Sequence, residues 1–535
     1  MTIGEKIANL RQNKKISQED LAFELDVSRQ AVSRWEMDQA IPQVDKILQL
    51  CKFFNVTTDE LLINKKNIAV LNNRTRNKYF GTDGFRGEAN VTLTSNHAYK
   101  IGRFLGWYYS KQKPNHRAKI VIGKDTRRSS YMLEYSIVAG ITASGADAYM
   151  LHVTTTPSVS YVARQDEFDC GIMITASHNP YYDNGIKIIN RFGEKLDDET
   201  TSLIESYIDG DLSNFDVSGD DLPLAVGEKL GVIVDYASGR NRYIAYLISL
   251  ASRSFKSLKI ALDCANGSSW MIAKSVFSAL GAQVYAIGDE PDGLNVNKNC
   301  GSTNVHNLCK LVKEKHFDLG FAFDGDADRC IAVDDKGNVV DGDKMLYVLA
   351  NRLKERGMLN KNTVVATVMS NSGFIASLNE IGVNCEQTKV GDRFVYELMQ
   401  NEDYSLGGEQ SGHIIIKKYA TTGDGILTAL MITEQVLETK SSLSALTAPV
   451  KLYPQYLLNV RVKNKALVLN DERVDLAKRS VMEKINQKGR VLLRESGTEP
   501  IIRIMVECED ENLCKIYAEE IENAIISGGH KVGEN

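Results

Sequence analysis

Short apolar runs that alternate with helix-length segments constrain the fold of this chain more than any other feature. From about residue 78, runs rich in β-branched residues alternate with segments whose apolar residues recur at helical spacing. The runs lie at 119–123, 170–175, 259–263, 319–323 and 363–367. This alternation predicts α/β units with largely parallel sheets. Asp or Gly follows several of the runs, and α/β proteins bind ligands at the carboxyl ends of such strands.

The two ends of the chain show different patterns. Before residue 64, apolar residues recur in short helical segments, and Ser17 with Asp20 is typical of a capping box. After about residue 453, a strand, a helix near 471–487 and two further strands predict an α+β unit. The predicted division is a helical domain at 1–64, a linker at 65–78, α/β domains at 79–222, 223–338 and 339–450, and an α+β domain at 451–535.

Composition and motif content exclude several classes of protein. The chain has no uncharged apolar run near the roughly 20 residues of a membrane span, and its N-terminus lacks the apolar core of a signal peptide. Its nine cysteines are scattered without a C-x-x-C pair, which argues against a zinc ribbon or a secreted disulfide framework. Dinucleotide-binding and P-loop motifs are missing. We therefore expect a cytoplasmic protein that does not bind membranes.

A serine stands just past one of the apolar runs, in Thr175-Ala-Ser-His-Asn-Pro180. The Asn-Pro pair favours a turn that exposes the Ser177 hydroxyl at the strand end. Adjacent side chains rarely align for in-line proton transfer, so Ser177 and His178 do not predict a hydrolase pair. Taken alone, the motif favours a plain serine in a turn over a functional serine.

Three aspartates at alternate positions follow another apolar run, in the sequence D-G-D-A-D-R. Asp324, Asp326 and Asp328 offer the oxygen ligands that Mg²⁺ prefers. An EF-hand would need Gly at its sixth position and Glu at its twelfth, where this chain has Arg329 and Asp335. The remaining alternative is a solvated acidic loop. Arg329 indicates that an anion such as phosphate shares the site.

A glycine-rich segment, Gly407-Gly-Glu-Gln-Ser-Gly-His413, offers acceptors for sugar hydroxyls. Its glycines allow close backbone approach, while Glu409 and Ser411 supply side-chain oxygens. The pattern therefore predicts a sugar-binding loop.

Two further segments combine arginine with glycine. Arg494-Glu-Ser-Gly-Thr-Glu-Pro500, together with Arg503, has the guanidinium groups, hydroxyls and glycine turn of a phosphate cradle. Gly81-Thr-Asp-Gly-Phe-Arg-Gly87 places three glycines around Arg86. This second segment is either another anion contact or a tight turn.

The four main patterns together describe phosphoryl transfer to and from a sugar phosphate. Residues 79–530 resemble the α-D-phosphohexomutase family, with its four signature loops in family order. T-A-S-H-N-P looks like the phosphoserine loop, D-G-D-A-D-R the metal loop, G-E-Q-S-G-H the sugar loop and R-E-S-G-T-E-P the phosphate loop. Residues 81–87, 291–302 and 408–411 are similar to the phosphoglucosamine mutase subgroup, although Ala327 stands where that subgroup more often has Gly.

The resemblance implies a fold and an activity. The expected fold has three α/β domains with mixed sheets and a C-terminal α+β domain around one cleft, preceded by an all-α helix-turn-helix domain. The expected activity is the interconversion of glucosamine 6-phosphate and glucosamine 1-phosphate through a phosphoserine and a 1,6-bisphosphate, on the route to UDP-N-acetylglucosamine. The alternatives are phosphomannomutase or phosphoglucomutase activity, and a transcription regulator that senses a sugar phosphate.

The resemblance also implies roles for individual residues. The catalytic residues would be Ser177, Lys187, His178, Arg86 and His413. One Mg²⁺ would bind Asp324, Asp326, Asp328 and an oxygen of phosphorylated Ser177. The substrate would contact Arg329, Glu409, Ser411, Arg494, Ser496, Gly497, Thr498 and Arg503. Nearby metal and guanidinium charge is expected to lower the pKa of Lys187 so that it can act as a base. His413 either takes part in catalysis or orients the sugar loop.

Residues 17–36 resemble the helix-turn-helix of Cro/repressor-type domains. The second helix, from Ser28, would enter the major groove. The expected DNA contacts are Gln18, Arg29, Gln30 and Arg34. Residues 1–66 hold roughly ten basic and roughly ten acidic side chains, so affinity for DNA would be modest without dimerisation. The alternative is a module for protein contacts. The partners expected are a hexosamine phosphate, duplex DNA through residues 1–64 and a second copy of the chain.

Overall fold

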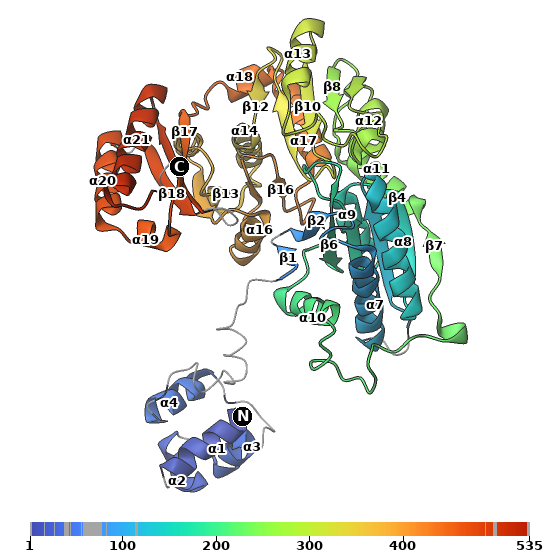
Figure 1. Cartoon of the computed structure of the whole chain (residues 1–535), viewed down its shortest axis with the longest axis vertical. Helices are drawn as coiled ribbons and strands as arrows, with labels where there is room; N and C mark the ends of the chain where they lie inside the picture. Colours follow the sequence, from blue (N-terminus) through green and yellow to red (C-terminus); the bar gives the residue numbers. More distant parts are fainter. Residues whose placement is uncertain are drawn as a thin grey trace. The chain divides into compact units, whose positions relative to one another are not determined.

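In the computed structural model the chain divides into two units, Met1–Lys78 and Tyr79–Asn535. Figure 1 traces both from the blue N-terminus to the red C-terminus. The structure describes residues 3–14, 16–25, 27–36, 42, 44–54, 56, 78–81, 83–112, 116–486, 488–495 and 500–531. The predicted linker lies outside these ranges except for its last residue. None of the described helices combines the length and the apolar character that crossing a membrane requires.

The smaller unit is helical. Its helices are α1 (Ile3–Asn13), α2 (Gln18–Glu24), α3 (Arg29–Glu36) and α4 (Val44–Phe54). Their apolar faces form one core that includes Leu21, Val32, Trp35 and Leu50. The predicted capping box is confirmed, because Ser17 Oγ accepts the Asp20 N–H at 3.1 Å and Asp20 Oδ2 accepts the Ser17 N–H at 2.8 Å.

A bidentate ion pair joins two of these helices. Arg11 Nε and Nη2 donate to the two carboxylate oxygens of Glu36 at 2.6 and 3.0 Å. Both side chains are largely buried, so loss of either partner would leave a charge without compensation. The pair therefore fixes α3 against α1.

The larger unit begins with a seven-stranded mixed sheet of order β1-β2-β6-β5-β3-β4-β7. Its strands are β1 (Phe80–Gly81), β2 (Gly84–Glu88), β3 (Lys119–Lys124), β4 (Asp147–Val153), β5 (Cys170–Ile174), β6 (Asp183–Asn190) and β7 (Ile233–Asp235). Its helices are α7 (Ser95–Gln112), α8 (Arg128–Ala143), α9 (Thr156–Gln165) and α10 (Asp198–Ile208). Figure 1 shows α7 and α8 side by side, and they pack together. β7 comes from residues that we expected to open the second α/β domain, yet it pairs in parallel with β4.

The second and third sheets follow, each again mixed. The second sheet has the order β12-β11-β10-β8-β9. Its strands are β8 (Lys259–Asp263), β9 (Gln283–Ile287), β10 (Leu319–Phe323), β11 (Cys330–Val333) and β12 (Val339–Val340). Its helices are α11 (Ala237–Leu250), α12 (Ser269–Ala279) and α13 (His306–Lys315). The third, of order β14-β13-β15-β16, comprises β13 (Thr363–Thr367), β14 (Asn384–Thr388), β15 (Leu406–Gly408) and β16 (Ile414–Ile416). Its helices are α14 (Gly342–Glu355), α15 (Ser372–Glu380), α16 (Asp392–Asn401), α17 (Gly425–Thr439) and α18 (Leu443–Thr447).

One hydrophobic core serves both of these sheets. It runs from Tyr243 to Val450 and joins Phe321 and Phe323 of β10 to Ile426 and Leu430 of α17. Burial of this apolar surface makes the two sheets a single packed body. Loops that follow strands of either sheet are therefore held in a fixed relation to each other.

The chain ends in a three-stranded antiparallel sheet of order β17-β19-β18. It comprises β17 (Gln455–Arg461), β18 (Gly489–Glu495) and β19 (Ile501–Cys508), with α19 (Lys465–Leu469), α20 (Glu472–Ile485) and α21 (Glu511–Ser527). This sheet has its own core. The structure thus has the predicted class: three mixed α/β sheets, a C-terminal α+β unit and an N-terminal helical unit.

Candidate active site

Ser177 lies in a strained turn directly after β5. Its φ of 53° is in the left-handed region, which costs a non-glycine residue about 1–2 kcal/mol. The side chain is buried, and its hydroxyl donates to Asp324 Oδ2 at 2.5 Å. Such strain persists only where the surroundings enforce it, and it concentrates at functional sites.

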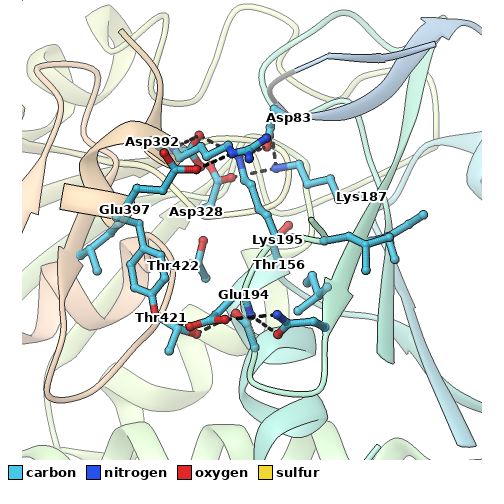
Figure 2. A pocket seen from close by; sticks show the side chains of 18 of the residues that line it. Asp83, Thr156, Lys187, Glu194, Lys195, Asp328, Asp392, Glu397, Thr421 and Thr422 are labelled. Carbon is cyan, nitrogen blue, oxygen red and sulfur yellow. Dashed lines mark hydrogen bonds and ion pairs between the residues drawn. The ribbon is translucent and has the colours of Figure 1, made fainter. Parts of the chain in front are cut away.

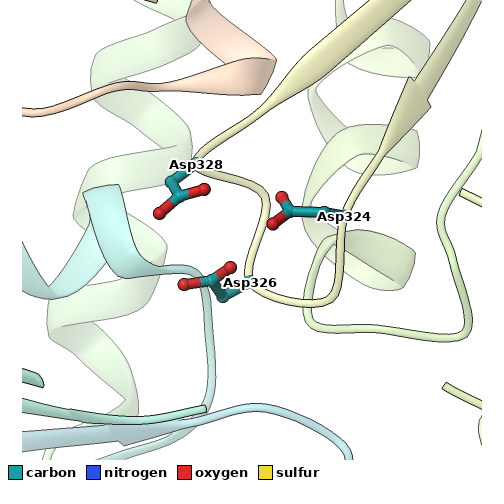
Figure 3. Close-up of side chains that lie close together, drawn as sticks. All are labelled: Asp324, Asp326 and Asp328. Atoms are coloured by element: carbon teal, nitrogen blue, oxygen red, sulfur yellow. The ribbon is translucent and has the colours of Figure 1, made fainter. Parts of the chain in front are cut away.

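The carboxylates of Asp324, Asp326 and Asp328 converge from one loop after β10 (Figure 3). All three are buried, and one oxygen of each lies within 4.8 Å of the others. Burial and the charges of Asp328 and Asp326 raise the pKa of Asp324 well above its ordinary value. The Oδ1 atoms of Asp326 and Asp328 have no hydrogen-bond partner among the described residues. A buried all-oxygen donor set with two unpartnered atoms fits a hard divalent cation such as Mg²⁺.

The serine and aspartate loops touch through backbone as well as side chains. A Cβ on Gly325 would stand 2.4 Å from the Ser177 carbonyl oxygen, so only glycine allows this approach. Thr156, at the start of α9, donates from its backbone N–H to the Asp326 carbonyl at 3.0 Å and from Oγ1 to Asp326 Oδ2 at 2.5 Å. The first sheet therefore holds the aspartate loop directly against Ser177.

Lys187 on β6 supplies a buried positive charge to the same loop. Its Nζ lies 2.8 Å from Asp326 Oδ2, 2.8 Å from Asp328 Oδ2 and 3.2 Å from Asp83 Oδ2. Burial lowers the pKa of Lys187, but these three carboxylates more than offset burial and hold the pKa well above its ordinary value. Arg86, which itself pairs with Asp83, lowers the pKa of Lys187, but its contribution is smaller than that of the three carboxylates. In these contacts Lys187 is a cation.

His178 and Arg329 also lie close to Ser177. His178 Nδ1 is 3.2 Å from Ser177 Oγ and 3.2 Å from Arg329 Nη1. Burial, followed by the charges of Arg329 and Arg86, lowers the pKa of His178 to about 4, so the ring is neutral at pH 7. The buried Nε of Arg329 has no acceptor among the described residues, as expected for a guanidinium that binds an anion.

The predicted sugar loop connects β15 to β16. Gly391 donates its N–H to Glu409 Oε1 at 3.1 Å, and the exposed Ser411 lies 3.4 Å from Glu409 Oε2. A β-bridge between Arg329 and His413 ties this loop to the aspartate loop. The sugar loop thus sits beside the aspartate loop, as the sequence patterns require.

Two opposing influences act on His413. Burial lowers its pKa, but the carboxylates of Asp392 and Asp328, at 3.5 and 3.8 Å, raise it to about 8. Its Nε2 also accepts the Gly423 N–H at 2.9 Å, a bond that a protonated ring would lose. The Gly423 hydrogen bond is much shorter than the distances to the two carboxylates. These contacts favour the orienting role over proton transfer.

Arg494 and Arg503 face each other across β18 and β19. Directly opposed like charges on paired strands repel, so neither guanidinium is neutralised by the other. The buried Arg503 Nε also has no acceptor among those residues. The pair is therefore suited to bind an anion. Ser496, Gly497 and Thr498, predicted for the same cradle, lie outside the described residues.

A cavity of about 440 Å³ opens beside the aspartate loop, between the segment after β6 and helix α16 (Figure 2). Of the predicted residues, Lys187, Asp328 and His413 line it, whereas Ser177, Glu409 and Ser411 do not. Lys195 crosses it, with Nζ 2.9 Å from Asp83 Oδ1 and 2.7 Å from Asp392 Oδ1.

Sequence reasoning missed several residues of this site: Asp83, Thr156, Lys195 and Asp392. Asp83 stands inside the glycine segment around Arg86, and Thr156 follows a strand, so both carried a local signal. Lys195 and Asp392 carried none, because they meet only through the tertiary fold.

In the helical unit, the predicted DNA-contacting residues divide into two groups. Arg29, Gln30 and Arg34 are exposed on α3. Gln18 is part-buried, and its Nε2 donates to Glu36 Oε2 at 2.7 Å. The first three side chains therefore form an available polar face, while Gln18 also supports the fold.

Family comparisons match both units. Residues 77–214, 241–337 and 341–453 match alpha/beta/alpha domains I, II and III of phosphoglucomutase/phosphomannomutase, and residues 457–524 match its C-terminal domain. Residues 7–61 match a helix-turn-helix family.

Individual relatives agree with these matches. The chain is 56% identical over 455 residues to a phosphoglucosamine mutase of Lachnospira eligens, covering 85% of this chain and 100% of the relative. It is 46% identical over 448 residues to that of Bacillus cytotoxicus, covering 84% and 98%.

Solved structures share the fold. A phosphoglucomutase/phosphomannomutase family protein from Burkholderia thailandensis superposes with a TM-score of 0.69 at 22% identity, covering 85% of this chain and 98% of that one. An Aspergillus fumigatus N-acetylphosphoglucosamine mutase, solved with GlcNAc-6P and magnesium, gives 0.60 at 17% identity, covering 87% and 99%.

Proposed function

Because this chain belongs to the phosphoglucomutase/phosphomannomutase family, we propose that it interconverts glucosamine 6-phosphate and glucosamine 1-phosphate through phosphorylated Ser177. Its enzyme class is that of the phosphoglucosamine mutases, which are intramolecular phosphotransferases. The observation that carries the proposal is the Ser177 hydroxyl, held 2.5 Å from Asp324 within a three-carboxylate loop.

The proposed reaction has two transfers. Phosphorylated Ser177 gives its phosphoryl group to the C1 hydroxyl of glucosamine 6-phosphate, which forms the 1,6-bisphosphate and frees the serine. After the bisphosphate turns over, its 6-phosphoryl group returns to Ser177 and leaves glucosamine 1-phosphate. The charge on the phosphoryl oxygens must be neutralised during both transfers. We propose that Arg329 takes this role, and the support is its buried Nε–H, which lacks an acceptor among the described residues.

Asp324, Asp326 and Asp328 are the proposed ligands of one Mg²⁺, together with an oxygen of phosphorylated Ser177. When bound there, Mg²⁺ supplies positive charge at the reacting phosphoryl group. Around this point we propose that Lys187 and Arg86 compensate charge, that His178 contacts phosphate oxygens and that His413 orients the sugar loop.

Glucosamine specificity is tested by a substrate panel. The purified full-length chain is assayed with the 6-phosphates of glucosamine, glucose and mannose at saturating Mg²⁺. We expect the largest kcat/KM for glucosamine 6-phosphate. A preference for glucose or mannose phosphate would assign a sister activity, and turnover of none would favour a sugar-phosphate-sensing regulator.

Arg494 and Arg503, with Glu409 and Ser411, are the proposed contacts to the part of the substrate that does not react. A contact made equally in ground and transition states mainly affects KM. We therefore expect Arg503→Ala to raise KM about 10-fold or more, the scale of a lost charged hydrogen bond, with kcat nearly unchanged. The matched control is Arg461→Ala, an exposed arginine on the adjacent strand β17. A fall in kcat with unchanged KM would contradict an anchoring role.

We also propose that the helical unit binds duplex DNA through α3. The support is the helix-turn-helix match and the exposed face of Arg29, Gln30 and Arg34. Deletion of residues 1–66 should abolish mobility shifts of selected duplexes and leave mutase kcat within about twofold, because every mutase loop lies in the other unit.

Selection from a randomised duplex pool tests this second activity. Arg29→Ala should lose sequence preference, whereas Lys52→Ala, an exposed residue of α4, should not. For a dimer, the enriched sites should contain two half-sites about one helical turn apart. No enriched sequence at any salt concentration would instead make the unit a protein-contact module.

A further inference from the structure

The backbone that carries Ser177 is held by the buried side chain of Arg127. Arg127 follows β3 and has no exposed surface. A guanidinium has five N–H donors, and here each of them meets an acceptor. The acceptors are Asp125 Oδ2 at 2.8 Å and the carbonyl oxygens of Ser177 at 3.0 Å, Asn179 at 2.8 Å, Asp183 at 3.0 Å and Pro180.

Buried hydrogen bonds also connect Arg127 to the Ser177 N–H through Asp125 and Thr175. Asp125 Oδ2, which accepts from Arg127, also accepts the Thr175 hydroxyl at 2.8 Å. Thr175 Oγ1 in turn accepts the Ser177 N–H at 2.9 Å. The N–H and the C=O of Ser177 are therefore fixed by one network.

Asn297 holds the same loop from the second sheet's side. Its Nδ2 donates to the carbonyl oxygens of Ser177 at 2.8 Å and Asn179 at 3.0 Å, two of the acceptors that Arg127 also uses. Asn297 is itself anchored, since its N–H donates to the Ala265 carbonyl at 2.8 Å. It lies in the loop between β9 and α13, outside the aspartate loop.

We infer that Arg127 and Asn297 are positioning residues that clamp the strained Ser177 turn from two sides and so keep its Oγ at the aspartate loop. The inference rests on the proposed role of Ser177 as the phosphate carrier. Neither side chain contacts the reacting oxygen; each binds the carbonyl of the residue that bears it. Without the clamp, the unfavourable φ of Ser177 can relax, and a displacement of about 1 Å costs up to about 100-fold in rate.

Asn297→Ala is the main test, with Asn299→Ala as its control. Both asparagines occupy left-handed positions, with φ of 57° and 54°, so alanine imposes a similar backbone cost at each. Asn299 is exposed and does not bond the serine loop. For Asn297→Ala we expect kcat to fall about 10- to 100-fold, with KM within about threefold and the same thermal midpoint as the control. Equal kcat in the two variants would overturn the inference.

Arg127→Lys gives a second, conservative variant. It keeps the charge but replaces five donors in a fixed fork by three at one point. In both clamp variants, glucose 1,6-bisphosphate should phosphorylate Ser177 more slowly than in the wild type, as followed by intact mass. Wild-type phosphorylation rates in both variants would contradict the clamp. A wild-type protein that takes up no phosphoryl group would instead refute the proposed function, so the two failures are distinguishable.

Discussion

Ser177→Ala is expected to abolish mutase turnover, with kcat reduced by roughly four orders of magnitude or more. Loss of the covalent nucleophile removes the reaction path through the phosphoserine, and comparable nucleophile deletions lower kcat by up to about 10⁶-fold. In the wild type, intact-mass analysis should show a phosphoryl adduct after incubation with glucose 1,6-bisphosphate. The variant should show none, because its only change removes the hydroxyl that Asp324 orients.

Ser202→Ala serves as the control for this experiment. Ser202 is an exposed serine on α10 of the same sheet unit, and its hydroxyl donates to the carbonyl of Asp198 on its own helix. Its variant should keep the adduct and full turnover. Substantial activity in Ser177→Ala would remove the phosphoserine from the mechanism.

The second large effect is expected for Asp326→Asn. Asp326 contributes one carboxylate to the candidate metal site. Its Oδ2 also accepts hydrogen bonds from Thr156 Oγ1 at 2.5 Å and from Lys187 Nζ at 2.8 Å. An amide loses the charge that draws a divalent cation and places a donor where acceptors are needed. We expect kcat to fall roughly 100-fold or more and the Mg²⁺ concentration for half-maximal activity to rise.

Metal removal tests the same site without a mutation. Excess chelator should abolish wild-type turnover, and added Mg²⁺ should restore it. Asp335→Asn is the matched control, since Asp335 lies beyond the loop and instead accepts hydrogen bonds from Ser444. Full activity of the wild type in excess chelator would exclude a metal-dependent reaction.

Local pattern was enough to predict most strands and the loops that follow them. The predicted strands at 259–263, 319–323 and 363–367 have the observed bounds, because each is a short apolar run ended by a charged or polar residue. The aspartate loop could also be predicted, since its three carboxylates are close in sequence and one oxygen of each lies within 4.8 Å of the others.

Contacts between segments distant in sequence could not be predicted from local pattern. The position of β7 depends on pairing with β4, which is more than 80 residues away by the register of Ala148 and Ile233. The sequence also did not show that Asp83, Asp326 and Asp328 converge on the amine of Lys187 and raise its pKa. Contacts between segments distant in sequence therefore decide the electrostatics that local motifs leave open.

The core shared by the second and third sheets governs the order in which this protein can fold during synthesis. Helix α17 packs on β10 and β11, yet it is made about 100 residues after them. The apolar face of β10 that meets α17 thus stays uncovered until residue 439 leaves the ribosome. The core of this central region is incomplete until helix α17 has been made, while the C-terminal sheet, with a core built from residues 456–525, can fold as soon as it emerges. Truncation upstream of α17 would therefore expose an aggregation-prone surface, whereas truncation at residue 450 would leave the central core complete.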